Sequence, residues 1–445
     1  MNKQLKPSMF NYQTQINNNI ILYNSMIGIN SICKVSNDKK QKVLSLLNSE
    51  RVEHNENDPD LIKLYEYGFL VNIDKNEKNA RNLLYGQYIF DGVLNLVLHT
   101  TKQCNFRCEY CYLDFKAEPM STEVQESVIK FIEKNLYKYN CVKINWFGGE
   151  PLLEMGVIEN ISTRVMEICK RAKKPYYATV TTNGYLLTKE NIKKLIKYRV
   201  DSYTITIDGL YETHDRLRHL KGNMPSFSTI INNLLYIKNE VKCSRLRITI
   251  RSNLTKENSK LIDDYYTFFD KNFGDDRRFS LFFRPVRDVG GERIENIKSD
   301  LFSNDEFNEL LFELSSKFNG KIGLVSNYSE LEPAGYTCPA ICQGKYTIDV
   351  EGKVGKCDSI EDDIKIGELD KKGNLIRYGT YEEDWITGCF DYKKECEDCF
   401  FSATCYKGTC PIDRVRKCDR QCKKNHKEID ALIKMYMNSH KFKTI

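Results

Sequence analysis

The stretch CNFRCEYC, residues 104–111, decides the fold, because it places three cysteines in one short loop directly after an apolar segment. The preceding residues Leu94–His99 are predicted to form a strand, so the loop begins where that strand ends. Three thiolates at spacings of four and three can wrap one compact cluster and leave one iron of a cubane without a protein ligand. A tetrahedral zinc site normally has a fourth ligand, and the nearest histidine, His99, lies within the strand. The spacing therefore favours an iron–sulfur cluster over zinc and leaves both open.

The other cysteines support a metal-binding protein. The 445-residue chain has 17 cysteines, of which ten lie between Cys338 and Cys422. The number of cysteines is odd, and the first residues of the chain lack the apolar core of a signal peptide. Both observations argue against a disulfide framework and favour reduced, clustered thiols that bind metal. The remaining scattered cysteines are expected to be small buried residues: Cys33, Cys141, Cys169 and Cys243.

Composition excludes several classes of protein. Hydrophobic residues make up 41% of the chain and charged residues 29%, as in globular proteins of two to four domains. No apolar run reaches the roughly 18 residues of a membrane span, so we expect a cytoplasmic protein without a membrane partner. The net charge of +6 is dilute and no block of five like charges occurs, which argues against a nucleic-acid partner.

Residues 92–290 alternate between strand and helix patterns. Residues Thr122–Leu136, for example, form an amphipathic helix that Thr122 and Gln125 would start as a capping box. Such alternation predicts an α/β domain with parallel strands, either an open barrel or a doubly wound sheet. In both architectures the functional residues lie at the carboxyl ends of the strands. The six predicted strands are Leu94–His99, Val142–Phe147, Tyr176–Thr181, Ser202–Ile207, Leu246–Arg251 and Phe279–Arg284.

The remaining segments are predicted as separate parts. Residues 1–88 combine strands with two short helices, and Gly68 ends the second helix, which predicts a winged-helix-like unit or an N-terminal extension of the next domain. Residues 291–335 read as a linker or bridging helix. Residues 336–430 form the cysteine-rich part, and residues 431–445 complete a last amphipathic helix that starts near Glu428.

The cysteine loop with the aromatic Tyr110 resembles the signature of the radical S-adenosylmethionine (SAM) superfamily. The resemblance implies a partial (β/α)6 barrel of the TIM-like kind. It also implies that Cys104, Cys108 and Cys111 hold a [4Fe–4S] cluster, whose fourth iron chelates SAM. Tyr110 would then pack beside the adenine of SAM.

Three further strand ends fit this resemblance. Gly148, Gly149 and Glu150 resemble the family's GGE motif, in which the carboxylate meets the methionine ammonium of SAM. Thr182 and Asn183 fit the loop that faces the ribose, and Asp208 through Arg218 resembles the family's DGxxxxHDxxR stretch. Each of these segments can also be read as an ordinary turn or helix start.

The cysteine-rich part resembles a SPASM domain, a module that carries auxiliary [4Fe–4S] clusters. The resemblance implies one cluster on Cys338, Cys342, Cys357 and Cys410, and a second on Cys396, Cys399 and Cys405 with Cys422, or alternatively Cys418. Cys410 departs from the module's spacing by one residue, and zinc-ribbon chemistry is the alternative. Asp358 stands where some relatives place a proton-accepting carboxylate, or it is an exposed hairpin residue.

Together these resemblances imply an enzyme with three [4Fe–4S] clusters, one that binds SAM and two auxiliary. The implied reaction starts with a 5′-deoxyadenosyl radical. A SPASM tail behind an N-terminal unit that looks like a leader-binding domain suggests a maturase of ribosomally made precursor peptides, with a flavodoxin or ferredoxin as electron donor. The leading hypothesis is thioether formation between cysteine sulfur and a carbon atom. Alternatives are carbon–carbon crosslinking, epimerisation, and formylglycine formation in a sulfatase; the non-enzymatic alternative is a zinc-binding interaction protein.

Overall fold

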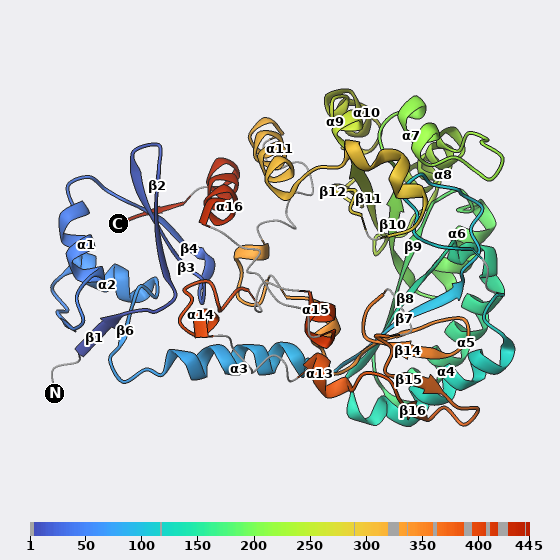
Figure 1. Cartoon of the computed structure of the whole chain (residues 1–445), viewed down its shortest axis with the longest axis horizontal. Coiled ribbons are helices and arrows are strands. Elements are labelled where there is room, and N and C mark those ends of the chain that lie inside the picture. Colours follow the sequence, from blue (N-terminus) through green and yellow to red (C-terminus); the bar gives the residue numbers. More distant parts are fainter. Residues whose placement is uncertain are drawn as a thin grey trace. The chain divides into compact units, whose positions relative to one another are not determined.

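The computed structural model divides the chain into two compact units, which are described separately (Figure 1). The first unit contains Met1–Asp91, Asn308–Cys342 and Glu383–Ile445, and the second contains Gly92–Phe307 and Gln343–Glu382. The structure describes residues 4–115, 118–288, 290–318, 329–335, 337–358, 363–386, 394–405, 410–416, 426–440 and 442–445.

The second unit is built on six parallel strands, as the sequence predicts. Neighbours along the chain pair in order, which makes the sheet the predicted partial (β/α)6 barrel. Figure 1 shows the connecting helices on the outer side of the curved sheet. The strands are β7 (Val93–Thr101), β8 (Cys141–Gly148), β9 (Tyr176–Thr182), β10 (Val200–Thr206), β11 (Arg247–Leu254) and β12 (Phe279–Pro285). The main helices between them are α4 (Thr122–Asn135), α5 (Met155–Ala172), α6 (Lys189–Lys197), α8 (Phe227–Glu240) and α10 (Ile262–Phe273).

Local chemistry explains these elements. In β8, Val142, Ile144 and Trp146 are buried while Lys143 between them is exposed, which is the period-two pattern of a strand. Helix α4 starts one residue earlier than the predicted capping box. Its N-cap is Ser121, whose hydroxyl accepts the Val124 N–H at 3.3 Å. The predicted box on Thr122 is therefore wrong, because the serine before it already satisfies the helix terminus.

Four more strands extend the sheet beyond β7. Strand β13 (Lys345–Ile348) pairs with β7 in parallel and with β14 (Lys353–Gly355) as an antiparallel hairpin. Strands β15 (Gly367–Leu369) and β16 (Leu375–Arg377) follow, each antiparallel to the strand before it. The Asn95 N–H donates to the Gly344 carbonyl at 2.8 Å, so the first residues after the chain re-enters this unit lie along β7. Strands β13 to β16 therefore continue the barrel sheet, a pairing that local sequence patterns did not predict.

The first unit contains two small sheets. One has the order β17-β4-β3-β2 and the other β5-β1-β6. The strands are β1 (Gln4–Pro7), β2 (Asn11–Ile16), β3 (Asn19–Asn24), β4 (Gly28–Val35), β5 (Val52–Glu53), β6 (Leu70–Asn72) and β17 (Lys443–Thr444). The helices include α1 (Lys40–Leu47), α2 (Pro59–Glu66), α3 (Glu77–Ile89) and α16 (His426–Ser439). Helix α11 (Asn304–Lys317) lies within the predicted bridging segment, and α16 covers the start of the predicted last helix. The prediction that this helix continues to residue 445 is wrong, because α16 ends at Ser439 and residues 443–444 pair with β4 as a strand.

The core of the first unit joins distant parts of the chain. Ile21 and Tyr23 of β3 pack in one cluster with Leu331, Phe401 and Ile433. The Tyr23 hydroxyl also donates to the Leu331 carbonyl at 2.6 Å. The predicted recognition unit of residues 1–88 therefore shares its hydrophobic core with later segments.

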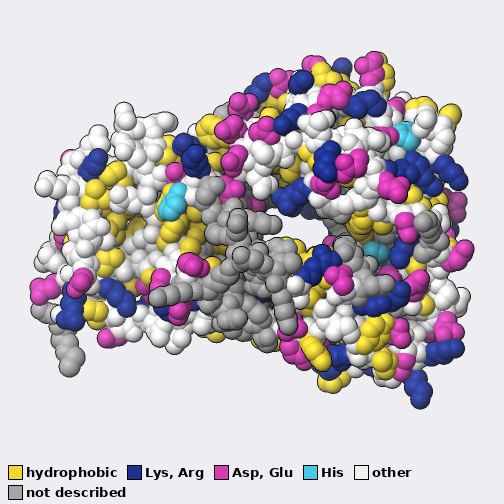
Figure 2. All heavy atoms as spheres, viewed as in Figure 1, with side chains coloured by type: hydrophobic (Ala, Val, Ile, Leu, Met, Phe, Trp, Pro, Cys, Tyr) yellow, Lys and Arg dark blue, Asp and Glu magenta, His cyan; other side chains and the backbone are white. Residues whose placement is uncertain are grey.

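No described helix is both long and apolar enough to cross a membrane. On the visible face of the second unit, Lys and Arg side chains are interspersed with Asp and Glu (Figure 2).

Candidate functional site

The cysteine loop follows β7 in the second unit and lies along the segment after α7 (Tyr211–Leu217). The Arg107 N–H donates to the His219 carbonyl at 2.9 Å, and the Glu109 N–H donates to the Leu217 carbonyl at 3.0 Å. Phe106 and Leu220 form an isolated β-bridge between the same two segments. Backbone bonds therefore fix the loop at the carboxyl end of the sheet.

Gly148 and Gly149 hold the other side of this loop. The Gly149 N–H donates to the Thr101 carbonyl at 2.8 Å. A Cβ at Gly148 would lie 2.2 Å from the Thr101 oxygen, and a Cβ at Gly149 would lie 2.1 Å from the Gln103 oxygen. The φ of Gly148 is +125°, which also favours glycine. Both glycines are thus needed for the backbone of residues 101–103, which leads into Cys104, to approach β8.

Glu150 joins the ends of β8 and β9. Its carboxylate is fully buried and accepts hydrogen bonds from the Thr182 hydroxyl at 2.7 Å, the Asn183 N–H at 2.7 Å and the Leu152 N–H at 3.0 Å. Burial raises the pKa of Glu150, and the hydrogen bonds from Asn183 and Thr182 oppose that rise. A carboxylate has about four acceptor positions, so about one remains for a ligand.

Asn183 connects β9 to the cysteine loop. Its Nδ2 donates to Asn105 Oδ1 at 2.8 Å and lies 3.9 Å from Cys104 Sγ. The predicted SAM-binding residues Glu150, Thr182 and Asn183 therefore meet in one hydrogen-bonded group beside the first cysteine.

Tyr110 is the centre of a second buried group. Its hydroxyl donates to Asp208 Oδ2 and accepts hydrogen bonds from Arg218 Nη1 at 2.7 Å and Asn253 Nδ2 at 3.0 Å. Burial, together with Asp208, raises the pKa of Tyr110 well above its ordinary value of 10.0, although Arg218 opposes the rise. The neutral phenol thus ties the loop to the ends of β10 and β11. Asn253, near the end of β11, was not among the predicted site residues.

His214 and Asp215 support the hydrogen-bonded group around Tyr110. The Asp208 N–H donates to His214 Nδ1 at 3.1 Å, and His214 Nε2 lies 3.1 Å from Ser226 Oγ. Burial lowers the pKa of His214 well below its ordinary value, so the ring is neutral. Asp215 accepts the Phe227 N–H at 2.8 Å and caps α8. His214 and Asp215 of the HDxxR pattern therefore have structural roles: His214 holds the backbone of Asp208, and Asp215 caps α8.

The three loop thiols, Cys104, Cys108 and Cys111, are the predicted ligands of a cluster. Burial raises the pKa of Cys104 to about 12 and that of Cys108 to about 11, and the neighbouring thiols contribute to both shifts. The guanidinium of Arg218 opposes the shift at Cys108. Three mutually interacting sulfurs in a partly buried loop beside the buried cation of Arg218 fit a thiolate-bound iron–sulfur cluster. Within the described ranges, no three His, Cys, Asp or Glu side chains are grouped as ligands of a metal ion.

Asp358 lies in the second unit, directly after Cys357. Its Oδ1 accepts hydrogen bonds from Lys345 Nζ at 2.8 Å and Thr347 Oγ1 at 3.5 Å. The pKa of Tyr112 is raised to about 12, first by burial and then by Cys111, Asp358 and Cys357. Asp358 is therefore close enough to the cysteine loop to act on it electrostatically, and its role as a base stays a prediction.

The predicted auxiliary-cluster cysteines are divided between the units. Cys338, Cys342, Cys396, Cys399, Cys405 and Cys410 belong to the first unit and Cys357 to the second, while Cys418 and Cys422 lie outside the described residues. Cys342 Sγ donates to the Tyr88 carbonyl at 3.5 Å, and the Cys399 N–H donates to the Cys396 carbonyl at 3.4 Å. Both auxiliary ligand sets stay predictions.

A pocket that the sequence analysis missed adjoins Tyr110. It has a volume of about 540 Å³ and is lined by residues of β10, β11 and β12 and of the segment after β12. The alternation of polar residues at Thr249, Arg251 and Asn253 could have indicated it, because residues two apart in a strand share a face. Its lining residues are Tyr110, Tyr112, Thr204, Thr249, Arg251, Asn253, Phe282, Arg284, Pro285, Val286 and Arg287.

Comparisons with known proteins agree with this geometry. Residues 98–264 match the Radical SAM superfamily. The chain is 25% identical over 342 residues to a cysteine-type anaerobic sulfatase-maturating enzyme of Clostridium novyi, covering 70% of this chain and 86% of that protein. It is 23% identical over 292 residues to the radical SAM cyclopropyl synthase TigE of Paramaledivibacter caminithermalis, covering 58% of this chain and 57% of TigE.

Two solved structures share the fold. The structure of anSMEcpe with bound AdoMet and the Cp18Cys peptide has a TM-score of 0.59 at 17% identity, covering 78% of this chain and 96% of that chain. The structure of Streptococcus suis SuiB bound to precursor peptide SuiA has a TM-score of 0.50 at 16% identity, covering 94% of this chain and 100% of that chain.

Proposed function

We propose that this chain, a radical SAM enzyme whose superfamily domain spans residues 98–264, matures a ribosomally made precursor peptide by forming thioether bonds. The observation that carries the proposal is the assembly of Cys104, Glu150 and Tyr110 at one end of a parallel sheet, beside a pocket of about 540 Å³. Likeness to anSMEcpe and SuiB, both solved with bound peptides, supports a peptide substrate.

The residues of the site have separable roles. Cys104, Cys108 and Cys111 would hold the [4Fe–4S] cluster. The remaining acceptor position of Glu150 would receive the ammonium of SAM, while Thr182 and Asn183 fix the carboxylate that offers it. When bound, the cluster and SAM supply the one-electron cleavage of SAM that starts hydrogen abstraction from the substrate. The Tyr110–Asp208–Arg218 group holds the cysteine loop in place and contributes to one wall of the substrate pocket.

Strand β2 of the first unit is the proposed docking edge for the leader of the precursor. It is an outer strand of its sheet and, at six residues, longer than β5, β6 or β17 at the other sheet edges. An added strand gains backbone hydrogen bonds in proportion to the length it can pair. This edge therefore offers more pairing to an extended leader than the other three.

Proline substitutions test this edge. Consecutive N–H groups in a strand point to opposite sides, so one of Thr14→Pro and Gln15→Pro removes an N–H that faces β3 and the other removes an outward N–H. The outward variant should keep its stability and lose leader binding. Leader affinity equal to that of the unmodified protein in both variants would rule out recognition at β2.

Mass spectrometry tests the reaction. The anaerobically reconstituted enzyme is incubated with SAM and with the precursor encoded by a short cysteine-rich reading frame beside the gene. Loss of two hydrogens together with loss of iodoacetamide labelling at a cysteine is the expected result. Loss of two hydrogens with labelling retained would indicate a carbon–carbon crosslink, and deuterium uptake without crosslinking would indicate epimerisation.

A second candidate function is formylglycine formation in a sulfatase. The 25% identity with a cysteine-type anaerobic sulfatase-maturating enzyme favours it. An aldehyde on a sulfatase-derived peptide, trapped with a hydrazide reagent, would establish this reaction instead. A colourless, zinc-loaded protein after anaerobic purification would contradict both functions.

A further inference from the structure

Strand β12 forms one edge of the barrel sheet. It stands at one end of the strand order, and among the described strands it pairs only with β11, in parallel (Figure 1). The other end of the same sheet is β16, which has three residues, whereas β12 has seven. All seven pairs between β11 and β12 keep one register. Strand β12 therefore presents the longer of the two edges of this sheet.

The direction of the backbone groups along β12 follows from two hydrogen bonds to β11. The Ile248 N–H donates to the Arg278 carbonyl at 2.8 Å, and the Val286 N–H donates to a carbonyl of β11 at 2.9 Å. Because the backbone groups of successive residues point to opposite sides of a strand, the even-numbered residues of β12 face β11. Leu281 and Phe283 therefore direct their N–H and C=O groups away from β11. Among the described residues, neither backbone has a hydrogen-bond partner on that side.

The side chains of β12 divide between the core and the pocket beside Tyr110. Leu281 and Phe283 are buried, whereas Phe282 between them lines the pocket. Successive side chains of a strand point to opposite faces of the sheet, and the same holds for a strand added at the edge. An extended segment paired with β12 would thus direct every second side chain toward the face on which the pocket lies.

The sequence of β12 does little to prevent such pairing. Natural edge strands are commonly protected by lysine, proline, a bulge or a very short length. The segment FSLFFRP contains no lysine, its proline is the last residue, and its pairing with β11 has no bulge. Pro285 leaves the N–H groups of Leu281 and Phe283 in place. The edge therefore keeps its capacity to pair with an extended chain, directly beside the pocket.

We propose that the core segment of the precursor peptide binds as an added strand at the outer edge of β12, held by the backbone groups of Leu281 and Phe283. This inference rests on the proposed function and specifies how its substrate binds. Main-chain pairing gives affinity, and the pocket selects among the side chains that face it. The core is the expected occupant because β12 itself lines the pocket of the site, whereas β2, the proposed leader edge, belongs to the other unit.

Amide hydrogen exchange resolved to single residues tests the edge directly. The reconstituted holoenzyme with SAM, without reductant so that no turnover occurs, is compared with and without the precursor encoded by the short cysteine-rich reading frame beside the gene. Binding should slow exchange of the Leu281 and Phe283 N–H groups at least about tenfold, because they gain hydrogen bonds. The N–H groups of Ser280 and Phe282 face β11 and should change less than about twofold. The leader alone should leave all four unchanged.

Two variants at one buried position separate the outward N–H from the side chain. L281P and L281A both remove the Leu281 side chain, but only L281P removes the N–H, at a place where an edge strand tolerates proline. L281P should bind the precursor about fivefold more weakly than L281A, as expected for the loss of one hydrogen bond. The Kd for SAM, measured for both variants, should be equal and serves as the control for folding.

Each other outcome overturns a defined statement. Slow exchange of Leu281 and Phe283 in the free enzyme would show that the edge is already covered, and if that enzyme is a dimer, a second copy of the chain is the occupant; both results overturn the inference. Protection by the leader alone assigns the edge to the leader and also overturns it.

Unchanged exchange at Leu281 and Phe283 with the precursor bound, or equal precursor affinity of L281P and L281A, overturns this inference and leaves the proposed function intact. No binding of the precursor by the unmodified holoenzyme, with SAM still bound, overturns the proposed function and this inference with it.

Discussion

At the scale of single residues, Glu150 illustrates how one buried carboxylate can organise a site. Its three donors come from the end of β9 and from the turn after β8. The sequence predicted Glu150 as a contact for SAM from its motif. It did not predict the contacts to Thr182 and Asn183, because hydrogen bonds between residues more than 30 positions apart depend on how the strands align.

Replacing Glu150 by Gln should destabilise the protein. The amide presents one acceptor and one donor group, so one of the buried donors would face an N–H. We expect a loss of about 2 kcal/mol in the free energy of unfolding, measured by urea denaturation. The control is E154Q, which changes a partly exposed Glu and should have an effect within about 0.5 kcal/mol. Equal stability of the two variants would show that the carboxylate does not tie the strands.

Substituting Gly149 should disturb the cysteine loop. The Cβ of G149A would lie 2.1 Å from the backbone oxygen of Gln103, so the loop must shift. The expected cost is about 3 kcal/mol, with about four fewer irons per chain after reconstitution. Gly156 in α5 is the matched control: nothing lies within 4 Å of its Cβ position, so G156A should stabilise by up to about 1 kcal/mol and retain full iron. Full iron in G149A would contradict the proposed link between the glycine and the loop.

At the scale of elements, the six barrel strands were predictable because each combines a run of regularly spaced apolar residues with polar residues at its carboxyl end. Strand β1 and helix α3 were not predicted. Helix α3 buries Glu77 and Arg81, which look like surface residues in the sequence. The Glu77 carboxylate accepts from Ser8 Oγ, and Arg81 donates to Ser402 Oγ at 2.9 Å. Such distant partners cannot be read from local periodicity.

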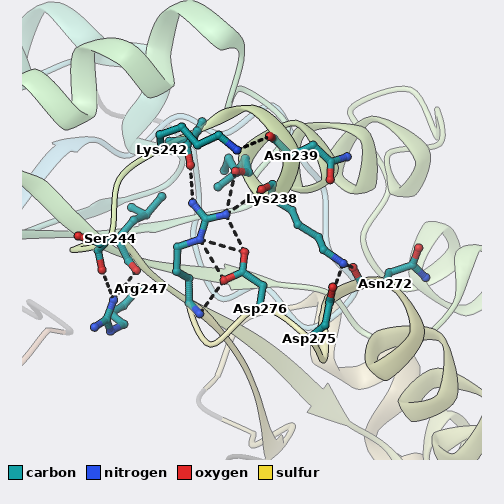
Figure 3. Close-up of polar contacts among 12 residues, drawn as sticks. Lys238, Asn239, Lys242, Ser244, Arg247, Asn272, Asp275 and Asp276 are labelled. Atoms are coloured by element: carbon teal, nitrogen blue, oxygen red, sulfur yellow. Dashed lines mark hydrogen bonds and ion pairs between the residues drawn. The ribbon is translucent and has the colours of Figure 1, made fainter.

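Helix α8 is closed at its C-terminus by a side chain from outside the helix. Arg278 donates to the carbonyls of Ile237, Lys238 and Val241 at 3.2, 2.9 and 2.6 Å, and its other edge binds Asp276 (Figure 3). The Ile237 carbonyl also accepts the Val241 N–H at 3.2 Å, whereas the last carbonyls of a helix generally lack intrahelical partners. Arg278 thereby links the end of α8 to the start of β12.

We expect R278A to lower the free energy of unfolding by about 2 kcal/mol, since several carbonyls lose a charged donor. R277A, which alters an exposed neighbour, should change it by less than about 0.5 kcal/mol. Thermal and urea denaturation of both variants measure the difference. If R277A and R278A behave alike, Arg278 does not cap the helix.

The Asp276–Arg278 pair also predicts a pH dependence. Burial would raise the pKa of Asp276, but the hydrogen bonds and charge of Arg278 outweigh it and hold the pKa below its ordinary value of 3.8. A depressed folded-state pKa stabilises the protein above the unfolded pKa, and this contribution is lost as the pH falls through the folded pKa. The stability difference between the unmodified protein and D276N should therefore be constant above about pH 5 and shrink below about pH 4. A difference that grows on acidification would contradict this assignment.

At the scale of the whole molecule, motif order predicted the barrel and its cysteine loop, whereas the division of the chain into units differs from the linear order of domains. Strand β13 joins the barrel sheet beside β7, and Ile445 is buried in the core of the first unit with Leu5, Leu22 and Val35. Motif spacing identifies modules along a sequence. It carries no information on which distant strands pair.

The variant I445A tests the closure of the first unit. Ile445 is 1% exposed, and its N–H donates to the Lys34 carbonyl at 2.9 Å. Truncating this side chain should cost about 2–4 kcal/mol in the stability of the first unit and leave the Kd for SAM unchanged. T444A, which alters an exposed neighbour, should be nearly neutral. Hydrogen exchange resolved by peptide separates the units, and equal protection in both variants would contradict the packing of Ile445.

The pairing of β17 with β4 has a consequence for folding during synthesis on the ribosome. Residues 443 and 444 complete a sheet whose other strands are made within the first 35 residues, so the nascent chain holds that sheet unfinished while some 400 residues are synthesised. The barrel sheet likewise lacks β13 until residue 348 has been made. Apolar strand edges exposed for this long invite association with other chains. Production of this protein should therefore depend on chaperones that bind early and release late.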